Sequence, residues 1–189
     1  IVHRLDKETS GVMVVAKNHK SHSYISSQFQ ERKVEKIYHA LVWGSVEKEG
    51  IIEGNMIRNN RDRKSFILTD RPGRQSKTSF KLDKNVGPIS LVELKPVTGR
   101  THQIRVHMKY IGHPVISDTL YSGGKAMIKS FHIKYTELLK KIIKIIPRVA
   151  LHASSIEFIH PITQKREKYC APLAKDMTQI LSLLETYEL

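Results

Sequence analysis

The segment His3-Arg4-Leu5-Asp6-Lys7-Glu8-Thr9-Ser10-Gly11 stands directly before an apolar, β-branched run at residues 12–16. Such short runs are typical of buried strands, so we expect a strand over residues 12–16. A second polar segment, Gly99-Arg100-Thr101-His102-Gln103-Ile104-Arg105-Val106-His107, follows a predicted strand at residues 90–97. Both segments place polar groups at the rim of a core, where a fold can hold them in the fixed positions that catalysis requires.

The second segment is predicted to turn into a helix that is capped by Thr101 and closed by Gly112. Apolar residues spaced i, i+4 and i+7 predict its buried face: Ile104, Met108 and Ile111. Three polar residues share the opposite face: His102, Arg105 and Lys109. On composition alone this face is typical of a solvated helix surface.

The remaining elements are predicted from hydrophobic periodicity and from turn residues. Helices are expected from an Asn18 cap to about residue 32, over residues 138–146, and from Pro172 onward. Strands are expected over residues 37–43, 51–57, 78–82, 90–97, 151–159 and 166–170. Because strands outnumber helices and occur in hairpin-like pairs, we predict an α+β fold with a mostly antiparallel sheet flanked by helices.

The charge of the chain indicates a polyanionic partner. Its 189 residues include 32 Lys and Arg against 18 Asp and Glu, a formal net charge of +14. Nucleic acid is the first expectation and an anionic membrane surface the second. No apolar segment is long enough for a membrane helix, and no signal peptide is recognisable. The chain is long enough for one domain with its own core, and we expect a monomer.

Several kinds of site are excluded by the sequence. The only cysteine is Cys170, so neither an internal disulfide nor a multi-cysteine zinc site can form, and a reducing, cytoplasmic location is expected. Neither a phosphate-binding P-loop nor a dinucleotide motif occurs. The ten histidines do not have metal-ligand spacing. We therefore predict that no metal and no cofactor takes part.

Several motifs together resemble the RluA-type RNA pseudouridine synthases. The first is the segment from His3 to Gly11, and the second is the segment from Gly99 to His107. The rest, in the same order as in the family, are Glu35-Lys36-Ile37-Tyr38-His39-Ala40, Gly112-His113-Pro114-Val115, Leu120-Tyr121 and Leu151-His152-Ala153. Six pieces in family order, which extend over most of the chain, make the resemblance specific.

The resemblance implies the pseudouridine synthase catalytic fold and isomerisation of uridine to pseudouridine in structured RNA, without cofactor or metal. The family's catalytic aspartate falls on Asp6, and the arginine that ion-pairs with it falls on Arg105. The tyrosine that lies against the target base falls on Tyr38. The arginine that fills the space left by the flipped nucleotide falls on Arg4.

Further RNA contacts are expected at the second motif and in a basic stretch between residues 58 and 74. The predicted substrate-binding residues there are Arg100, His102, Ile104, Arg58, Arg61, Arg63 and Lys64. A carboxylate such as Asp6 can act as a nucleophile, at C6 of the base or C1′ of the sugar, or as a proton shuttle. The order of these steps stays open.

The family carries strands and a helix before the first motif, and often a small RNA-binding domain before those. We therefore expect residues 1–189 to be a catalytic domain whose N-terminal part is missing. The resemblance implies ribosomal RNA as the first expected target, with transfer RNA as the second. The same motifs are also compatible with a non-catalytic RNA-binding module, and with a truncated synthase that binds RNA without turnover.

Overall fold

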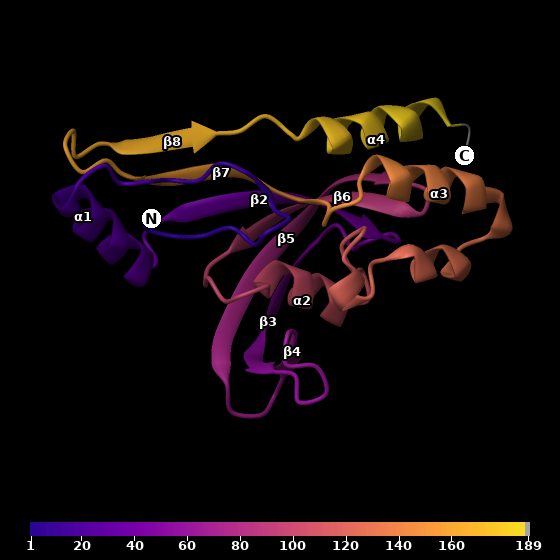
Figure 1. Ribbon diagram of the computed structural model, residues 1–189, viewed down its shortest axis with the longest axis horizontal. Helices are drawn as coiled ribbons and strands as arrows, with labels where there is room; N and C mark the ends of the chain where they lie inside the picture. Colours follow the sequence, from indigo (N-terminus) through magenta and orange to yellow (C-terminus); the bar gives the residue numbers. More distant parts are fainter. Residues whose placement is uncertain (188–189) are drawn as a thin grey trace.

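The computed structural model describes residues 1–187, and an eight-stranded sheet forms its centre (Figure 1). The strands are β1 (Ser10–Gly11), β2 (Glu35–Trp43), β3 (Glu49–Arg58), β4 (Phe66–Thr69), β5 (Arg74–Val86), β6 (Ile89–Pro96), β7 (Leu151–Ile159) and β8 (Arg166–Cys170). Their order is β1-β7-β2-β6-β5-β3-β4, and β8 also pairs with β7. Apart from β1, which runs parallel to β7, the paired strands are antiparallel. The predicted α+β class is confirmed.

Four α-helices accompany the sheet: α1 (His19–Gln30), α2 (Gln103–Tyr110), α3 (Thr136–Ile145) and α4 (Lys175–Thr186). The predicted cap of α1 is confirmed, because the Asn18 side chain accepts a hydrogen bond from the Ser21 N–H at 2.9 Å. The terminal helix begins three residues later than predicted. The chain stays extended past Pro172, because the Ala171 N–H still donates to the Ser154 carbonyl of β7 and Ala174 has an extended backbone.

The main core lies between β2, β6 and the helices α2, α3 and α4. Leu41 and Trp43 of β2 are at most 1% exposed although they alternate with Ala40 and Val42, which are also buried. Both faces of this central strand are therefore covered. The Trp43 indole N–H is satisfied inside the core by the Gly123 carbonyl at 2.8 Å. The buried second half of β2 thus anchors the strand, whose first half carries the predicted site residue Tyr38.

The predicted strand over residues 12–16 is wrong. Strand β1 has only two residues, Ser10 and Gly11, and Met13 and Val15 beyond it are exposed. The reason is competition for one edge of β7: β1 takes residues 152–153, and β8 takes residues 155–159 of the same strand. The chain leaves that edge at Gly11, whose φ of +115° is a conformation that glycine adopts readily.

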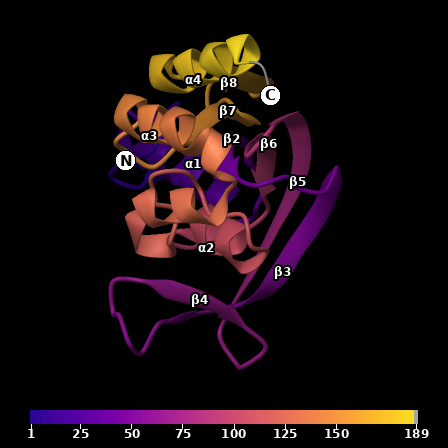
Figure 2. The ribbon, with the colours of Figure 1, turned by 90° about the vertical axis from the view of Figure 1, so that its right-hand side faces the viewer.

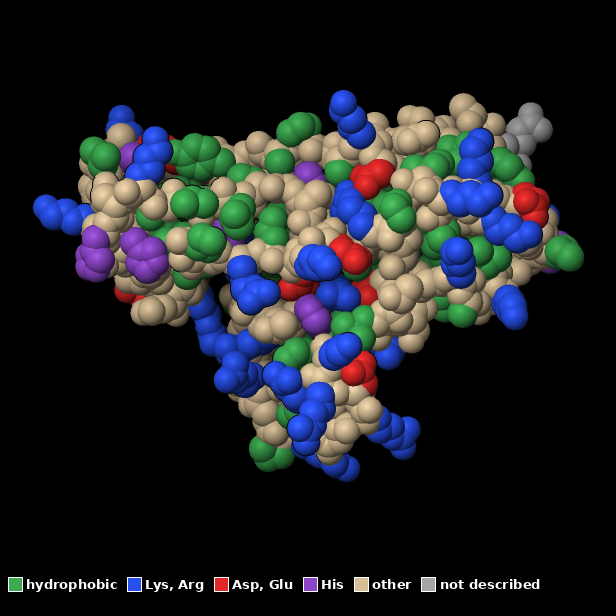
Figure 3. All heavy atoms as spheres, viewed as in Figure 1, with side chains coloured by type: hydrophobic (Ala, Val, Ile, Leu, Met, Phe, Trp, Pro, Cys, Tyr) green, Lys and Arg blue, Asp and Glu red, His purple; other side chains and the backbone are tan. Residues whose placement is uncertain are grey.

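Strands β3, β4 and β5 form an arm that projects away from α3 and α4 (Figures 1 and 2). We use the name arm for residues 54–76, where β3 pairs with β4 on one side and β5 on the other. Strand β4 lies within the basic stretch between residues 58 and 74, where the sequence pattern predicts no strand. Lys and Arg side chains gather over the arm in Figure 3.

Within the described residues, no helix has the length and apolar character needed to cross a bilayer.

Candidate active site

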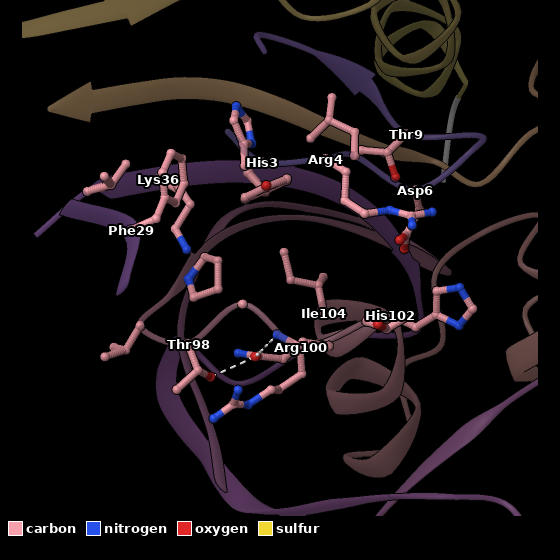
Figure 4. A pocket seen from close by; sticks show the side chains of 18 of the residues that line it. His3, Arg4, Asp6, Thr9, Phe29, Lys36, Thr98, Arg100, His102 and Ile104 are labelled. Carbon is pink, nitrogen blue, oxygen red and sulfur yellow. Dashed lines mark hydrogen bonds between the residues drawn. The ribbon is translucent and has the colours of Figure 1, made fainter. Parts of the chain in front are cut away.

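A cleft of about 480 Å³ lies where the segment before β1, the first half of β2 and the loop from β6 to α2 meet (Figure 4). Seven of the predicted site residues line it: Arg4, Asp6, Tyr38, Arg100, His102, Ile104 and Arg105. These residues come from three parts of the chain that are far apart in sequence. The structure therefore brings together the two long polar segments and the Tyr38 motif.

Asp6 is held by contacts that flank it. The Thr9 N–H donates to the Asp6 carbonyl at 3.0 Å and closes a turn. Directly after this turn Ser10 pairs with His152 of β7, and the Ser10 hydroxyl hydrogen-bonds with His152 Nδ1 at 2.9 Å. The Asp6 side chain is 23% exposed. Its carboxylate is thus anchored through the backbone but open to a ligand in the cleft.

Arg105 joins two carboxylates, of which only one was predicted. Its Nη1 lies 3.5 Å from Asp6 Oδ2. Its Nε and Nη2 donate to the two carboxylate oxygens of Asp118, at 2.6 and 2.8 Å. Asp118 is completely buried, and the Arg105 guanidinium also lies over the Tyr121 ring at 4.9 Å. Asp118 therefore fixes the orientation in which Arg105 meets Asp6.

The charge on Arg105 is secured by the same contacts. Burial acts against the charge, but the hydrogen bonds and charge of Asp118 outweigh it, and the pKa of Arg105 is raised above its usual value. One face of the guanidinium fork is thus committed to a permanent partner. Only Nη1 remains for the cleft.

Helix α2 differs from the prediction in its start and in its exposure. Thr101 is not the cap; the N-cap position is His102, which has a left-handed backbone with φ +58° and makes no side-chain capping bond. Composition alone is typical of a solvated face for His102, Arg105 and Lys109; in the structure Lys109 is exposed, His102 is half-buried and Arg105 is buried. Arg105 is buried because α2 packs against β4, β5 and β6 and because Asp118 and Tyr121 enclose its guanidinium. The closure at Gly112, with φ +85°, is as predicted.

The Gln103 side chain, which the sequence did not single out, holds the loop before α2. Its Oε1 accepts from the Thr98 hydroxyl at 2.6 Å and from the Arg100 N–H at 3.0 Å. Its Nε2 donates to the Lys77 carbonyl at 3.0 Å and to the Thr78 hydroxyl at 2.9 Å. All four hydrogen-bonding positions of this buried amide are therefore used, and the loop that forms one wall of the cleft is fixed to β5.

Two aromatic groups near Asp6 are held in their neutral forms. Burial, followed by the charge of Asp6, raises the pKa of Tyr38 to about 12, so its phenol keeps its proton at neutral pH. Burial lowers the pKa of His102, and its Nδ1 hydrogen-bonds with the Tyr121 hydroxyl at 2.8 Å. The end of the cleft near Asp6 thus offers a carboxylate, a guanidinium and a neutral phenol.

The four predicted arm residues do not line the cleft. Arg58 donates to the Arg63 carbonyl at 3.0 Å and lies over the Phe66 ring at 5.5 Å. Arg61, Arg63 and Lys64 are exposed near the tip of the arm. Any contact that they make with a ligand is therefore separate from the cleft.

Comparison with known proteins tests the family that the sequence motifs resemble. Residues 1–110 match the family model described as RNA pseudouridylate synthase. Ribosomal large subunit pseudouridine synthase D of Pseudomonas aeruginosa is 38% identical over 184 residues, which are 97% of this chain and 56% of that protein. Synthase C of Vibrio cholerae is 34% identical over 96% of this chain and 54% of its own length. The chain spans a little over half the length of these curated relatives.

Two solved structures of proteins with pseudouridylate synthase domains resemble this fold. The human protein RNA Pseudouridylate Synthase Domain Containing 1 superposes with a TM-score of 0.69 at 26% identity, covering 98% of this chain and 80% of that one. Human RNA Pseudouridylate Synthase Domain Containing 4 has a TM-score of 0.78 at 23% identity, covering 97% and 75%, and supports the fold. The family predicted from the motifs is confirmed: the chain belongs to the RNA pseudouridylate synthase family.

Proposed function

We propose that this chain isomerises uridine to pseudouridine in RNA, and that its target lies in the RNA of the large ribosomal subunit. The observation that carries the activity is the Asp6 carboxylate, open to the cleft and within 3.5 Å of a buried, oriented Arg105. The target is supported by the names of the relatives, which refer to the ribosomal large subunit.

The reaction breaks the bond between N1 of uracil and C1′ of ribose, and forms a bond between C5 and C1′. C5 loses a proton and N1 gains one, so atoms and electrons balance without a second substrate. In this proposal the Asp6 carboxylate supplies the nucleophile or the proton acceptor. Nη1 of Arg105 holds the carboxylate in place while bonds to it form and break.

The detached uracil must stay in the cleft and turn before it bonds again. Tyr38 and Ile104 line the cleft beside Asp6 and offer an aromatic and an aliphatic surface for the base. Because the pKa of Tyr38 is about 12, we assign it contact and hydrogen bonding through a neutral phenol, and not proton removal as a phenolate.

A uridine inside a helical stem can reach the cleft only if it is extruded, which costs a few kcal/mol. Arg4 is exposed at the rim of the cleft, two residues before Asp6. We propose that its guanidinium enters the vacated space in the RNA, where stacking and hydrogen bonds offset part of that cost.

The direct test compares Asp6→Asn with Glu47→Gln, an exposed carboxylate changed to an amide on the turn between β2 and β3. Both variants are made in the complete gene product and assayed for pseudouridine on ribosomal RNA. Asp6→Asn should abolish product and keep RNA affinity within a few-fold, while Glu47→Gln should behave like the unchanged protein. Turnover by Asp6→Asn would remove the mechanism.

The competing function is RNA binding without catalysis. It predicts that the unchanged protein binds RNA and forms no pseudouridine in any RNA. Mapping pseudouridines across the transcriptome with and without the gene distinguishes the two and also decides between ribosomal and transfer RNA as the target. A ribosomal target is consistent with the proposed cytoplasmic location.

The arm is proposed to contact RNA phosphates through Arg58, Arg61, Arg63 and Lys64. Phosphate contacts release counterions, so binding should weaken steeply as salt increases. Arg61→Gln and Arg63→Gln should each make the slope of log K against log salt shallower by about one unit. The control is Lys141→Gln on α3, an exposed lysine outside the arm and the cleft, which should leave the slope unchanged. Equal slopes for all variants would contradict the role of the arm.

A further inference from the structure

Lys36 occupies the cleft without a partner. Within residues 1–187 its ammonium makes no ion pair and no hydrogen bond. Lysines on β5 and β6 do have partners: Lys77 with Glu53 at 2.9 Å and Lys95 with Glu93 at 3.0 Å. An unpaired charge that is partly removed from water costs folding free energy. A substrate anion that pairs with the Lys36 ammonium would offset this cost.

The side chain of Lys36 crosses the cleft. In Figure 4 it extends from β2 toward the loop that carries Thr98 and Arg100, at the opposite end of the cleft from Asp6. The Lys36 ammonium lies 3.9 Å from the position that a Cβ on Gly99 would take. The absence of a side chain at Gly99 therefore leaves space beside the ammonium.

The surroundings of Lys36 strengthen its pull on an anion. Apolar residues also line the cleft, among them Phe29, Val34 and Pro96, and apolar groups screen charge poorly. Burial, followed by the charge of Lys36, lowers the pKa of His3, whose Nε2 accepts from the Val14 N–H at 3.0 Å. His3 is thus neutral. Burial also lowers the pKa of Lys36, and an anion bound beside the ammonium would favour its charged form.

The position of Lys36 relative to Tyr38 indicates which anion it meets. The two residues are i and i+2 on β2, so their side chains leave the same face and their Cα atoms are about 6.7 Å apart. A nucleotide whose base lies on Tyr38 carries its phosphates beyond its ribose. Among the described residues that line the cleft, five are Lys or Arg and Asp6 is the one carboxylate. The site is therefore built for a polyanion.

We propose that Lys36 binds a phosphodiester oxygen on one of the two linkages that flank the extruded uridine, and so holds the sugar while the uracil turns. This inference rests on the proposed function, since it takes the extruded nucleotide of RNA as the ligand. In this proposal the end of the cleft far from Asp6 binds the sugar-phosphate backbone of the RNA, and the end near Asp6 binds the uracil base.

The test is a double-mutant cycle in which one change is made in the protein and the other in the RNA substrate. Lys36→Met removes the charge but keeps an unbranched stem, and a methylphosphonate removes the charge of one linkage, either 5′ or 3′ of the target uridine. Dissociation constants are measured with the complete gene product and an RNA that carries the mapped target. Each single change should weaken binding about 10- to 100-fold at one linkage. Both changes together should weaken it little further.

Lys36→Met should also make the slope of log K against log salt for RNA binding shallower by about one unit. Lys36→Arg keeps the charge and should restore most of that slope. The matched control is Lys95→Met, which removes an exposed lysine that pairs with Glu93 outside the cleft. Thermal unfolding of every variant checks that the fold is unchanged. If the losses from Lys36→Met and from both methylphosphonates simply multiply, or if Lys36→Met binds normally, the assignment is wrong.

This result is separable from the proposed function. Pseudouridine formation by the unchanged protein on the unmodified RNA tests the function, whereas the cycle reads affinity and needs no turnover. A protein that converts uridine but shows multiplicative losses overturns the Lys36 site alone. A protein that converts no RNA overturns the proposed function, and absence of coupling in the RNA that it binds overturns the site as well.

Discussion

Replacing Asp118 with asparagine would remove the charge that balances Arg105 inside the protein. Asp118 is completely buried and accepts from Arg105 Nε at 2.6 Å and from Nη2 at 2.8 Å. It also accepts from the Tyr121 N–H at 3.2 Å. An amide can accept through its oxygen but turns an NH₂ toward the guanidinium at the other position, so one of the two bonds to Arg105 is lost together with the charge.

The size of the effect follows from this burial. Leaving one member of a buried ion pair without its partner costs about 3–5 kcal/mol. Asp6, at 3.5 Å from Arg105 Nη1, keeps part of the balance, so the lower end applies and we expect a loss of about 3 kcal/mol. For a chain of this length that corresponds to a decrease in Tm of roughly 6–12 °C.

A second pair in the same molecule provides a matched control. Arg148 and Asp176 form an equally bidentate pair, at 2.7 and 2.8 Å, but their side chains are 22% and 24% exposed. Asp176→Asn should therefore cost about 1 kcal/mol or less. Both variants are compared by denaturant unfolding followed by circular dichroism. If Asp118→Asn lowers the free energy of unfolding no more than Asp176→Asn does, burial does not increase the contribution of the Arg105–Asp118 pair to stability.

The double variant sharpens the test. Arg105→Met alone leaves the Asp118 carboxylate buried without its partner, and changing Asp118 to asparagine then removes that uncompensated charge. The double variant should therefore be more stable than Arg105→Met alone, with a coupling energy of about 1–3 kcal/mol. Independent, additive losses would refute the idea that the two residues form one buried unit.

Three further outcomes are expected. Arg105→Met and Asp6→Asn should each lower the single-turnover rate strongly, and the double variant should lose little more; losses that multiply would give Arg105 a separate role. Gly11→Ala should cost more than about 2 kcal/mol of unfolding free energy, because its φ is +115° and its Cβ would lie 2.1 Å from a carbonyl oxygen of β7. Gly112→Ala, with φ +85° and no atom within 4 Å of the new Cβ, should cost clearly less in the same unfolding experiment. Burial lowers the pKa of His107 from 6.5 to about 4, so the stability that it contributes is fully present above pH 6.5 and is lost as the pH falls toward 4. Between pH 7 and pH 4 the unchanged protein should therefore lose about 3 kcal/mol more than His107→Gln, and equal pH dependence of unfolding would contradict this.

The sequence predicts elements well where one pattern decides them. Residues 151–159 and 166–170 match β7 and β8 because their apolar residues flank a clear turn at His160 and Pro161. The run at residues 12–16 has an equally good strand pattern, but β8 already occupies the edge of β7 that it would need. Competition between distant segments for one edge is not visible in a local pattern.

The sequence predicts those site residues whose side chains are themselves candidates for catalysis or substrate contact. It does not predict residues that only orient another side chain. Asp6, Tyr38 and Arg105 were identified through the motifs, and the structure places all three in one cleft. Asp118 was missed because it lies in a segment without periodicity. A signal was available: a lone acidic residue two positions after the apolar Val115 and Ile116 indicates a buried carboxylate that needs a cation.

The parallel pairing of β1 with β7 also has a consequence for how the protein is made. Ser10 sits beside His152, so the backbone that positions Asp6 depends on residues synthesised about 140 positions later. At ~5–20 residues per second the nascent chain waits for roughly 7–28 s before that partner exists. Long-range pairings of this kind form late in folding because their loop closure is costly. The Asp6 carboxylate is therefore expected to reach its working position near the end of folding, so that an incomplete chain carries the motif but not the assembled cleft.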